Sequence, residues 1–312
     1  MIAQVERRCV VALDVGGTFL KGALVSMDGS ILTQSRVATR RAEGADAVVD
    51  RIYRFVLSLI ESARARGTTP AGLGLAVPGH VDEERGIAMS STNLGWHNVA
   101  LRDRLGSVAL PIAVRHDVRA GGVAESRLGA GRGWLNQVFI PIGTGIGCAI
   151  VMRGHAFAGD SYAAGEIGHI PVAGSNFPCG CGRVGCLETV ASAAAISRRF
   201  HPGSGLDEVD ARQVAEAVLA GDEHAARVWL DASSALAQAI VYSYCLLNID
   251  HYIIGGGLSL AGSTLLVPLR RAIEDLTPNR PRPAVVGADL GDNSGCIGAA
   301  LAMIDELGPQ PA

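Results

Sequence analysis

Three cysteines and a histidine gather near the middle of the chain. Cys179, Cys181 and Cys186 fall within eight residues, with glycines between them, and His169 stands ten residues before the first. Three thiolates and one imidazole complete the tetrahedral coordination of a structural zinc ion, which leaves no open position for a reacting water. The pattern therefore predicts a Zn²⁺ site that shapes a loop. His155 is the other candidate for the fourth ligand, and unbound surface thiols are the alternative interpretation.

Polar side chains flank this group of cysteines. Glu166 and His169 precede it and Glu188 follows it directly. A closed zinc site would fix the three side chains in one small region, where they offer acceptors and a donor to a polyhydroxyl ligand.

Three glycine-rich turns follow short apolar segments. They are Asp14-Val15-Gly16-Gly17-Thr18, Gly143-Thr144-Gly145-Ile146-Gly147 and Gly255-Gly256-Gly257. The first lies between two expected strands, which argues against a Walker A loop or a dinucleotide fingerprint, because both of these open a helix. Its backbone N–H groups can still approach phosphate oxygens, with a positive charge from Lys21 and a carboxylate from Asp14 for hydrated Mg²⁺. One such turn can be a simple hairpin, but three together predict one nucleotide held by several loops.

A carboxylate and an amide complete the candidate chemistry. Asp117 follows the end of an apolar segment, where it could accept a proton from a substrate hydroxyl that attacks phosphorus. A helix N-cap is the alternative role for this residue. Asn93-Leu94-Gly95-Trp96 offers an amide for hydroxyls and an aromatic face, or it is a turn anchored by a buried tryptophan.

Hydrophobic patterning predicts the elements that must position these residues. Apolar runs predict strands over residues 9–13, 21–25, 72–77, 111–114, 138–142, 148–152 and 252–254. Helical spacing predicts helices over residues 45–66, 118–128, most of 191–247 with a break near 201–203, and 295–307. The strand–glycine turn–strand unit occurs twice, which indicates an internally duplicated architecture with a boundary near residues 115–120.

Composition excludes several classes of protein. Of the 312 residues, 48% are hydrophobic and 18% are charged, which suits a large buried core and argues against disorder. The net charge of −3 gives no case for nucleic acid or an anionic membrane as the main partner. We expect a cytoplasmic protein with no membrane span, because there is neither an apolar run of roughly 18 residues nor a secretory signal pattern.

The motifs, taken in order, resemble those of the ROK family (repressor, open reading frame, kinase), which comprises sugar kinases and sugar-responsive regulators. The resemblance runs from residue 11 to about residue 302, nearly the whole chain. It is carried by DVGGTFLKGALV, AVPGHVD, NLGW, HDVRAGGVAE, IGTGIG, GEIGH, CGCGRVGCLE, IIGGGLS and SGCIGAALA. The order and spacing of GEIGH and CGCGRVGCLE are the most specific part.

The resemblance implies an α/β protein with the two-domain actin-like ATPase (ribonuclease H-like) kinase fold, with ATP in the interdomain cleft. Residues 1–117 would form an N-terminal α/β domain, completed by the last helix at about residues 295–312. Residues 118–294 would form a larger C-terminal α/β domain with the zinc-binding loop. Closure around a sugar and a homodimeric assembly are also implied.

The resemblance further implies roles for residues, with Asp117 as the catalytic base. The implied sugar contacts are Gly79, Asn93, His116, Asp117, Glu166, His169 and Glu188. The implied ATP and Mg²⁺ contacts are Asp14, Gly16, Gly17, Thr18, Lys21, Gly143, Thr144, Gly145, Gly255 and Gly256. The implied zinc ligands are His169, Cys179, Cys181 and Cys186.

The implied activity is ATP-dependent phosphorylation of a sugar hydroxyl, with the 6-hydroxyl of glucose as the first candidate. N-acetylglucosamine, N-acetylmannosamine or a cyclitol-like analogue are alternative acceptors, and polyphosphate is an alternative donor. A sugar-sensing regulator is the alternative of another class. Those regulators carry a helix-turn-helix segment first, and only eight residues precede the first expected strand here, so we expect an enzyme.

One position departs from the family pattern. His116 stands where the family usually has an asparagine immediately before the catalytic aspartate. Imidazole is bulkier than an amide and, when neutral, has one donor and one acceptor. This departure predicts a sugar, or a sugar orientation, that differs from plain glucose.

Overall fold

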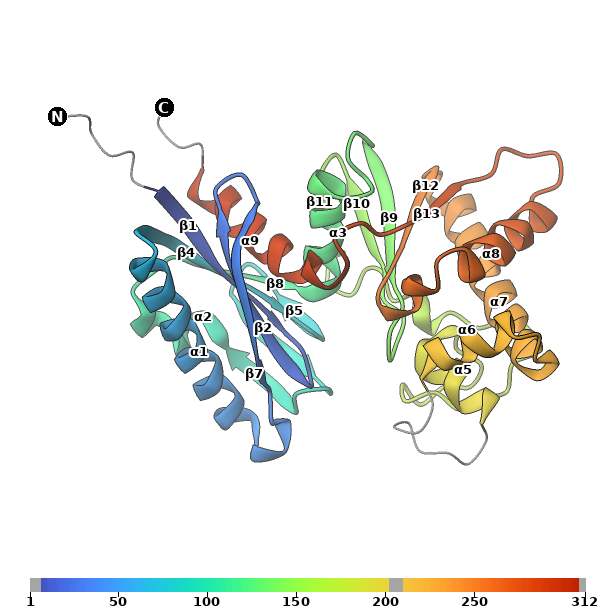
Figure 1. Cartoon of the computed structure of the whole chain (residues 1–312), viewed down its shortest axis with the longest axis horizontal. Helices are drawn as coiled ribbons and strands as arrows, with labels where there is room; N and C mark the ends of the chain where they lie inside the picture. The colour runs from blue at the N-terminus through green and yellow to red at the C-terminus, as the bar shows by residue number, and fades with distance from the viewer. Residues whose placement is uncertain (1–6, 202–209, 309–312) are drawn as a thin grey trace. The chain divides into compact units, whose positions relative to one another are not determined.

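The computed structural model describes residues 7–201 and 210–308, which form two compact units (Figure 1). Unit 1 comprises the described residues up to 124, residues 158–163 and those from 292 onward; unit 2 comprises residues 125–157 and 164–291. The division thus falls after residue 124, inside helix α3 (Asp117–Leu128), and not after residue 117 as expected. The expected helix break near residues 201–203 lies mostly outside the described residues.

Unit 1 is built on a five-stranded sheet. Its strands are β1 (Arg7–Val15), β2 (Phe19–Ser26), β3 (Ile31–Ala38), β4 (Thr68–Val77) and β8 (Ile112–His116), in the order β3-β2-β1-β4-β8. β1 pairs antiparallel with β2 and parallel with β4, and β4 pairs parallel with β8. The predicted β1–β2 hairpin is therefore present, whereas the more polar β3 lay outside the sequence prediction.

Helices α1 (Ala45–Ala65) and α9 (Ser294–Leu307) cover opposite faces of this sheet (Figure 1). Successive side chains of a strand point to opposite faces. Accordingly, Val11 and Leu13 pack in the cluster that includes α1, while Val10 and Ala12 pack in the cluster that includes α9. Burial on both faces explains why β1 is an almost continuous apolar run.

A small antiparallel sheet follows β4 in unit 1. It consists of β5 (His80–Asp82), β6 (Ile87–Ser91) and β7 (Trp96–Ala100), followed by α2 (Leu101–Arg104). The sequence pattern did not predict this sheet, because its strands are short and carry several polar residues. Trp96 is fully buried, so the tryptophan of the NLGW segment is a core anchor and presents no aromatic face to a ligand.

Unit 2 contains a second five-stranded sheet with the same topology. Its strands are β9 (Asn136–Pro141), β10 (Ala149–Met152), β11 (His155–Ala156), β12 (His251–Gly255) and β13 (Ala284–Gly287), in the order β11-β10-β9-β12-β13. In both sheets a consecutive antiparallel trio is extended by two parallel strands on the side of its first strand. The duplicated strand–turn–strand unit thus belongs to a duplicated sheet.

The helices of unit 2 are α4 (Glu188–Ala191), α5 (Ala193–Phe200), α6 (Ala211–Leu219), α7 (Glu223–Leu247) and α8 (Ser263–Leu276). Within the described ranges, α7 alone is long and apolar enough to cross a membrane by length and composition. A core helix meets the same criterion, and the inward side chains Trp229, Leu236 and Ile240 of α7 are at most 2% exposed. These side chains form part of the unit 2 core.

Short 3₁₀ helices complete the described structure. They are η1 (Arg41–Glu43), η2 (Gly106–Val108), η3 (Ile167–His169), η4 (Gly257–Ala261) and η5 (Gly291–Asn293). Three of them, η3, η4 and η5, carry or adjoin residues of the candidate site.

Candidate functional site

The β1–β2 hairpin presents the first glycine turn of unit 1. Asp14 is the cross-strand partner of Lys21, so their side chains lie on the same face of the sheet. The Lys21 Nζ atom lies 4.0 Å from an Asp14 carboxylate oxygen and 3.2 Å from an Asp292 carboxylate oxygen. The turn itself is closed by a 3.0 Å hydrogen bond from the Gly16 N–H to the Phe19 carbonyl. The only lysine of the chain thus lies between two carboxylates beside an exposed turn.

The Asp14 carboxyl lies where negative charge is disfavoured. Burial and, to a lesser degree, the charge of Asp117 raise the pKa of Asp14 to about 7, although the charge of Lys21 opposes this shift. The start of α9 crowds the same side chain, because a Cβ atom on Gly295 would lie 2.6 Å from the Asp14 carboxyl carbon. A bound cation would favour the ionised form of this carboxyl.

The β8–α3 junction positions Asp117 next to His116. The His116 Nε2 atom lies 3.4 Å from Asp117 Oδ1, and their side chains are 15% and 32% exposed. Asp117 Oδ1 also accepts a 2.7 Å hydrogen bond from the N–H of Val118. An N-cap side chain would accept from a residue two or three positions on, so this contact differs from the capping alternative.

Gly79 and Asn93 lie at the small sheet of unit 1. Gly79 has a φ of +100°. A Cβ atom there would come within 2.2 Å of the Ser90 carbonyl oxygen, so only glycine fits. A Cβ atom on Gly17 would meet the Asn93 carbonyl oxygen at 3.6 Å. The Asn93 turn therefore packs against the first glycine turn.

In unit 2 the other two glycine turns lie side by side. The Ile142 N–H donates to the Gly255 carbonyl at 2.9 Å, and the Leu258 N–H donates to the Ile142 carbonyl at 3.1 Å. Gly256, with a φ of +73°, approaches the Ile142 backbone so closely that a Cβ atom would lie 2.4 Å from its carbonyl oxygen. These contacts bring the turn that begins at Gly143 next to the turn that begins at Gly255.

The three predicted sugar-contact side chains of unit 2 fall into two places. Glu188, at the start of α4, accepts a 3.0 Å hydrogen bond from the Ile146 N–H and crowds Gly145. Glu166 instead lies 3.8 Å from His169 Nε2, with its side chain 61% exposed. One glutamate thus supports the glycine turn, while the other borders the cysteine cluster.

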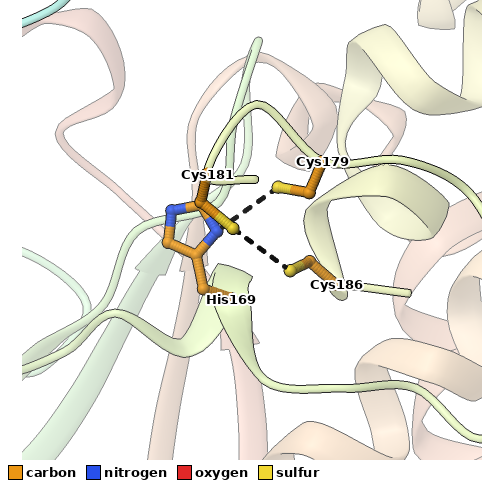
Figure 2. A group of neighbouring side chains, drawn as sticks. All are labelled: His169, Cys179, Cys181 and Cys186. Atoms are coloured by element: carbon orange, nitrogen blue, oxygen red, sulfur yellow. Dashed lines mark hydrogen bonds between the residues drawn. The ribbon is translucent and has the colours of Figure 1, made fainter. Parts of the chain in front are cut away.

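The cysteine cluster brings together the four predicted ligands (Figure 2). The ligand atoms of His169, Cys179, Cys181 and Cys186 all lie within 4.8 Å of one another. The His169 Nδ1–Cys179 Sγ and Cys181 Sγ–Cys186 Sγ distances are both 3.6 Å. Two sulfurs bound to one tetrahedral zinc ion lie about 3.8 Å apart, so the donor set fits zinc. His155 lies on β11 and is not a member of this group.

Electrostatics already favour one thiolate in the cluster. Hydrogen bonds from the backbone and side chain of Arg183 lower the pKa of Cys181 to about 6. Burial instead raises the pKa of Cys186 to about 12. An exposed thiolate next to a buried thiol suits a site in which a metal ion displaces the remaining protons.

The predicted site residues divide between the two units. Unit 1 contains Asp14, Gly16, Gly17, Thr18, Lys21, Gly79, Asn93, His116 and Asp117. Unit 2 contains Gly143, Thr144, Gly145, Glu166, His169, Cys179, Cys181, Cys186, Glu188, Gly255 and Gly256.

Two carboxylates of unit 1 lie next to predicted site residues but were not themselves predicted. Asp292, in η5, contacts Lys21, and Glu83, in the β5–β6 turn, accepts a hydrogen bond from the backbone N–H of His116. The acidic residue in the segment GDNSG before α9 is a weak signal for the first. No local pattern marks the second, since its turn joins strands that were not predicted.

Comparisons with known proteins identify the family of the chain. The family model for ROK proteins matches residues 10–306. A glucokinase from Thermotoga maritima is 33% identical over 316 residues, which cover 96% of this chain and 98% of the relative.

Solved structures of the same family share the fold. A ROK family glucokinase from Streptomyces griseus, crystallised with glucose and AMPPNP, has a TM-score of 0.80 at 28% identity, over 94% of this chain and 98% of that chain. A ROK family transcriptional regulator, a homologue of the E. coli MLC protein, has a TM-score of 0.83 at 26% identity, over 96% of this chain and 79% of that chain. The fold is therefore the actin-like ATPase fold of these glucokinases, and the chain belongs to the ROK family.

Proposed function

We propose that this protein is an ATP-dependent sugar kinase that phosphorylates a hexose, with glucose as the first candidate. The observation that carries the proposal is the Asp117 carboxylate, which lies beside His116 and interacts electrostatically with Asp14 of the first glycine turn. A proton acceptor and a phosphate-type turn within one unit are what phosphoryl transfer to a hydroxyl requires. The glucokinase from Thermotoga maritima, similar over nearly the whole chain, supports the same activity.

In the proposed reaction Asp117 orients the acceptor hydroxyl and takes its proton. The hydroxyl oxygen forms a bond to the γ-phosphorus of ATP, the bond from that phosphorus to the bridging oxygen breaks, and ADP leaves with the bonding electron pair. Lys21 and the N–H groups of the glycine turns stabilise the negative charge on the phosphate oxygens. Mg²⁺, held through Asp14, would neutralise further charge on the phosphates.

The proposed sugar contacts are Gly79, Asn93, His116, Glu166, His169 and Glu188. The His116 Nε2 atom lies 3.4 Å from Asp117 Oδ1, so His116 would meet the hydroxyls next to the one that reacts. We therefore propose that His116 determines whether the acceptor is glucose, an N-acetylhexosamine or a cyclitol-like compound.

We further propose one structural Zn²⁺ bound by His169 and the three cysteines. The ligand-atom separations and the low pKa of Cys181 support it. The ion would close the loop between Pro171 and Cys186 and so hold Glu166 and Glu188 at its two ends. A homodimer and a cytoplasmic location complete the proposal.

The test is ADP release by the purified protein with ATP and Mg²⁺, across hexoses, N-acetylhexosamines and cyclitols. We expect turnover with one class of sugar and a loss of at least about 100-fold in Asp117→Asn. Asp103→Asn makes the same chemical change at an exposed position of α2 and should leave the rate unchanged. A folded, zinc-loaded protein that releases no ADP with any sugar would contradict the kinase and favour a sugar-responsive binding role.

A further inference from the structure

The carboxylate of Glu83 contacts His116, directly before Asp117, and Arg119, two residues after it. Glu83 Oε1 accepts a 3.0 Å hydrogen bond from the backbone N–H of His116 and a 2.7 Å hydrogen bond from Nε of Arg119. Its other oxygen lies 3.8 Å from Nε of Arg115, on β8. One oxygen atom therefore ties the end of β8 to the first turn of α3.

Arg119 has this carboxylate as its counter-ion. Its side chain is 3% exposed, and within the described part of the chain Glu83 is the one carboxylate that contacts it. The Nη1 atom donates to the Tyr162 carbonyl at 3.1 Å, and Nη2 is buried without a hydrogen-bond partner among the described residues. A buried guanidinium needs its counter-ion, so the Arg119–Glu83 pair fixes the geometry of both side chains.

The turn that presents Glu83 is itself held firmly. Asp82 accepts hydrogen bonds from the Arg85 N–H on its carboxylate and from the Gly86 N–H on its carbonyl, both at 2.9 Å. Arg102 donates to the Glu84 carbonyl at 2.6 Å from the neighbouring α2. Glu83 is therefore presented from a rigid support and not from a free loop.

From these contacts we infer that Glu83 is a positioning residue for phosphoryl transfer, acting through the His116 backbone and the Arg119 side chain to hold Asp117 toward the acceptor hydroxyl. The inference rests on the proposed function, because it presumes that Asp117 is the base. Asp117 lies one residue after His116 and two residues before Arg119, so its backbone has little freedom while Glu83 contacts both. A displacement of the base by about 1 Å is enough to reduce a rate by about 100-fold.

Steady-state kinetics on Glu83 variants test the inference. We expect Glu83→Ala to lower kcat by at least about tenfold while the KM for ATP stays within about twofold, since the glycine turns are untouched. Glu83→Gln keeps an oxygen that can accept both hydrogen bonds, so it should recover at least about threefold of that loss. Glu84→Ala removes an exposed side chain from the same turn and serves as the matched control.

A second readout needs no catalysis. Hydrogen exchange of the His116 amide should become at least about tenfold faster in Glu83→Ala, because that N–H loses its acceptor, and should stay slow in Glu84→Ala. If Glu83→Ala does not fold, Glu83→Gln and Arg119→Lys take its place, and Arg119→Lys should lower kcat at unchanged KM for ATP.

The outcomes separate this inference from the proposed function. A wild-type protein that phosphorylates no sugar contradicts the kinase proposal, and with it the positioning role of Glu83 in that reaction, whatever the exchange result. If the wild type is active, a kcat in folded Glu83→Ala equal to that of the wild type overturns the inference alone. A second result also overturns the inference: kcat falls equally in Glu83→Gln and Glu83→Ala, the KM for ATP rises, and hydrogen exchange at His116 does not change. That result would indicate a general loss of structure.

Discussion

The ionised Asp14 side chain destabilises the ligand-free protein, although the same charge suits it to bind a cation. Its folded-state pKa of about 7 lies above the ordinary aspartate value of 3.8, mainly because the carboxyl is buried. A raised pKa means that the protonated form stabilises the fold. This contribution is complete below pH 3.8 and is lost as the pH rises through about 7, so ionised Asp14 destabilises the ligand-free protein at neutral pH.

Asp14→Asn should therefore stabilise the ligand-free protein as the pH rises. We expect the free energy of unfolding to exceed that of the wild type by about 1–3 kcal/mol at pH 8, a range discounted for the partial exposure of the side chain. The difference should shrink toward zero at pH 4. Urea unfolding at the two pH values, without Mg²⁺ or nucleotide, measures it. An equal difference at both would contradict the assignment of the shift to this carboxyl.

The loop around the cysteine cluster is the element whose shape depends most on bound metal. Cys181→Ser should reduce the zinc content from one ion per chain to nearly none and lower the Tm by about 5–10 °C. Cys245, an exposed cysteine on α7 outside the cluster, provides the control, and Cys245→Ser should change neither quantity. Metal analysis and thermal unfolding measure both. Full zinc occupancy in Cys181→Ser would contradict the four-ligand site.

The small residues of α9 allow it to approach the elements that carry the candidate base. A Cβ atom on Gly298 would lie 2.0 Å from the Ala120 carbonyl oxygen of α3. Gly298→Ala should therefore destabilise the protein by about 2–4 kcal/mol despite the higher helix propensity of alanine.

An added Cβ on Gly106, in η2, would meet no atom of the described residues within 4 Å beyond its own chain neighbours, so Gly106 gives the matched control for this substitution. Gly106→Ala should change the free energy of unfolding by less than about 1 kcal/mol. Chemical denaturation of both variants measures the contrast. If both substitutions changed the free energy of unfolding equally, close packing of α9 on α3 would not be needed for stability.

At the scale of the whole molecule, binding and catalysis should separate. A ligand at 100 times its Kd stabilises the folded state by about 2.7 kcal/mol. The cognate sugar should therefore raise the Tm of both the wild type and Asp117→Asn, because an amide still accepts a hydrogen bond from the sugar hydroxyl. Thermal unfolding with and without sugar measures this, and loss of the shift in Asp117→Asn would assign Asp117 to binding instead of proton transfer.

Much of the architecture could be predicted because local hydrophobic patterns indicate most of its helices and strands. The continuous apolar run of β1, the helical spacing of α1 and the small residues of α9 each identify an element within a short window. The repeat of the strand–glycine turn–strand unit predicted a duplicated architecture, and the two five-stranded sheets do have matching strand orders. The polar β3, the short strands β5 to β7 and the last strand β13 lack such a signal, because their pairing partners and not their own patterns stabilise them.

Residue types and short spacings were enough to predict the family, the two glycine-turn hairpins and the grouping of Cys179, Cys181 and Cys186. These depend on residue type and on neighbours a few positions apart. Three contacts became known from the three-dimensional structure: His169 and not His155 joins the cysteines, Glu188 supports the glycine turn, and Glu83 accepts a hydrogen bond from the His116 N–H. Such contacts join residues that are 33 or more positions apart in two of these cases, and packing of distant elements, which no local pattern encodes, brings them within hydrogen-bond distance.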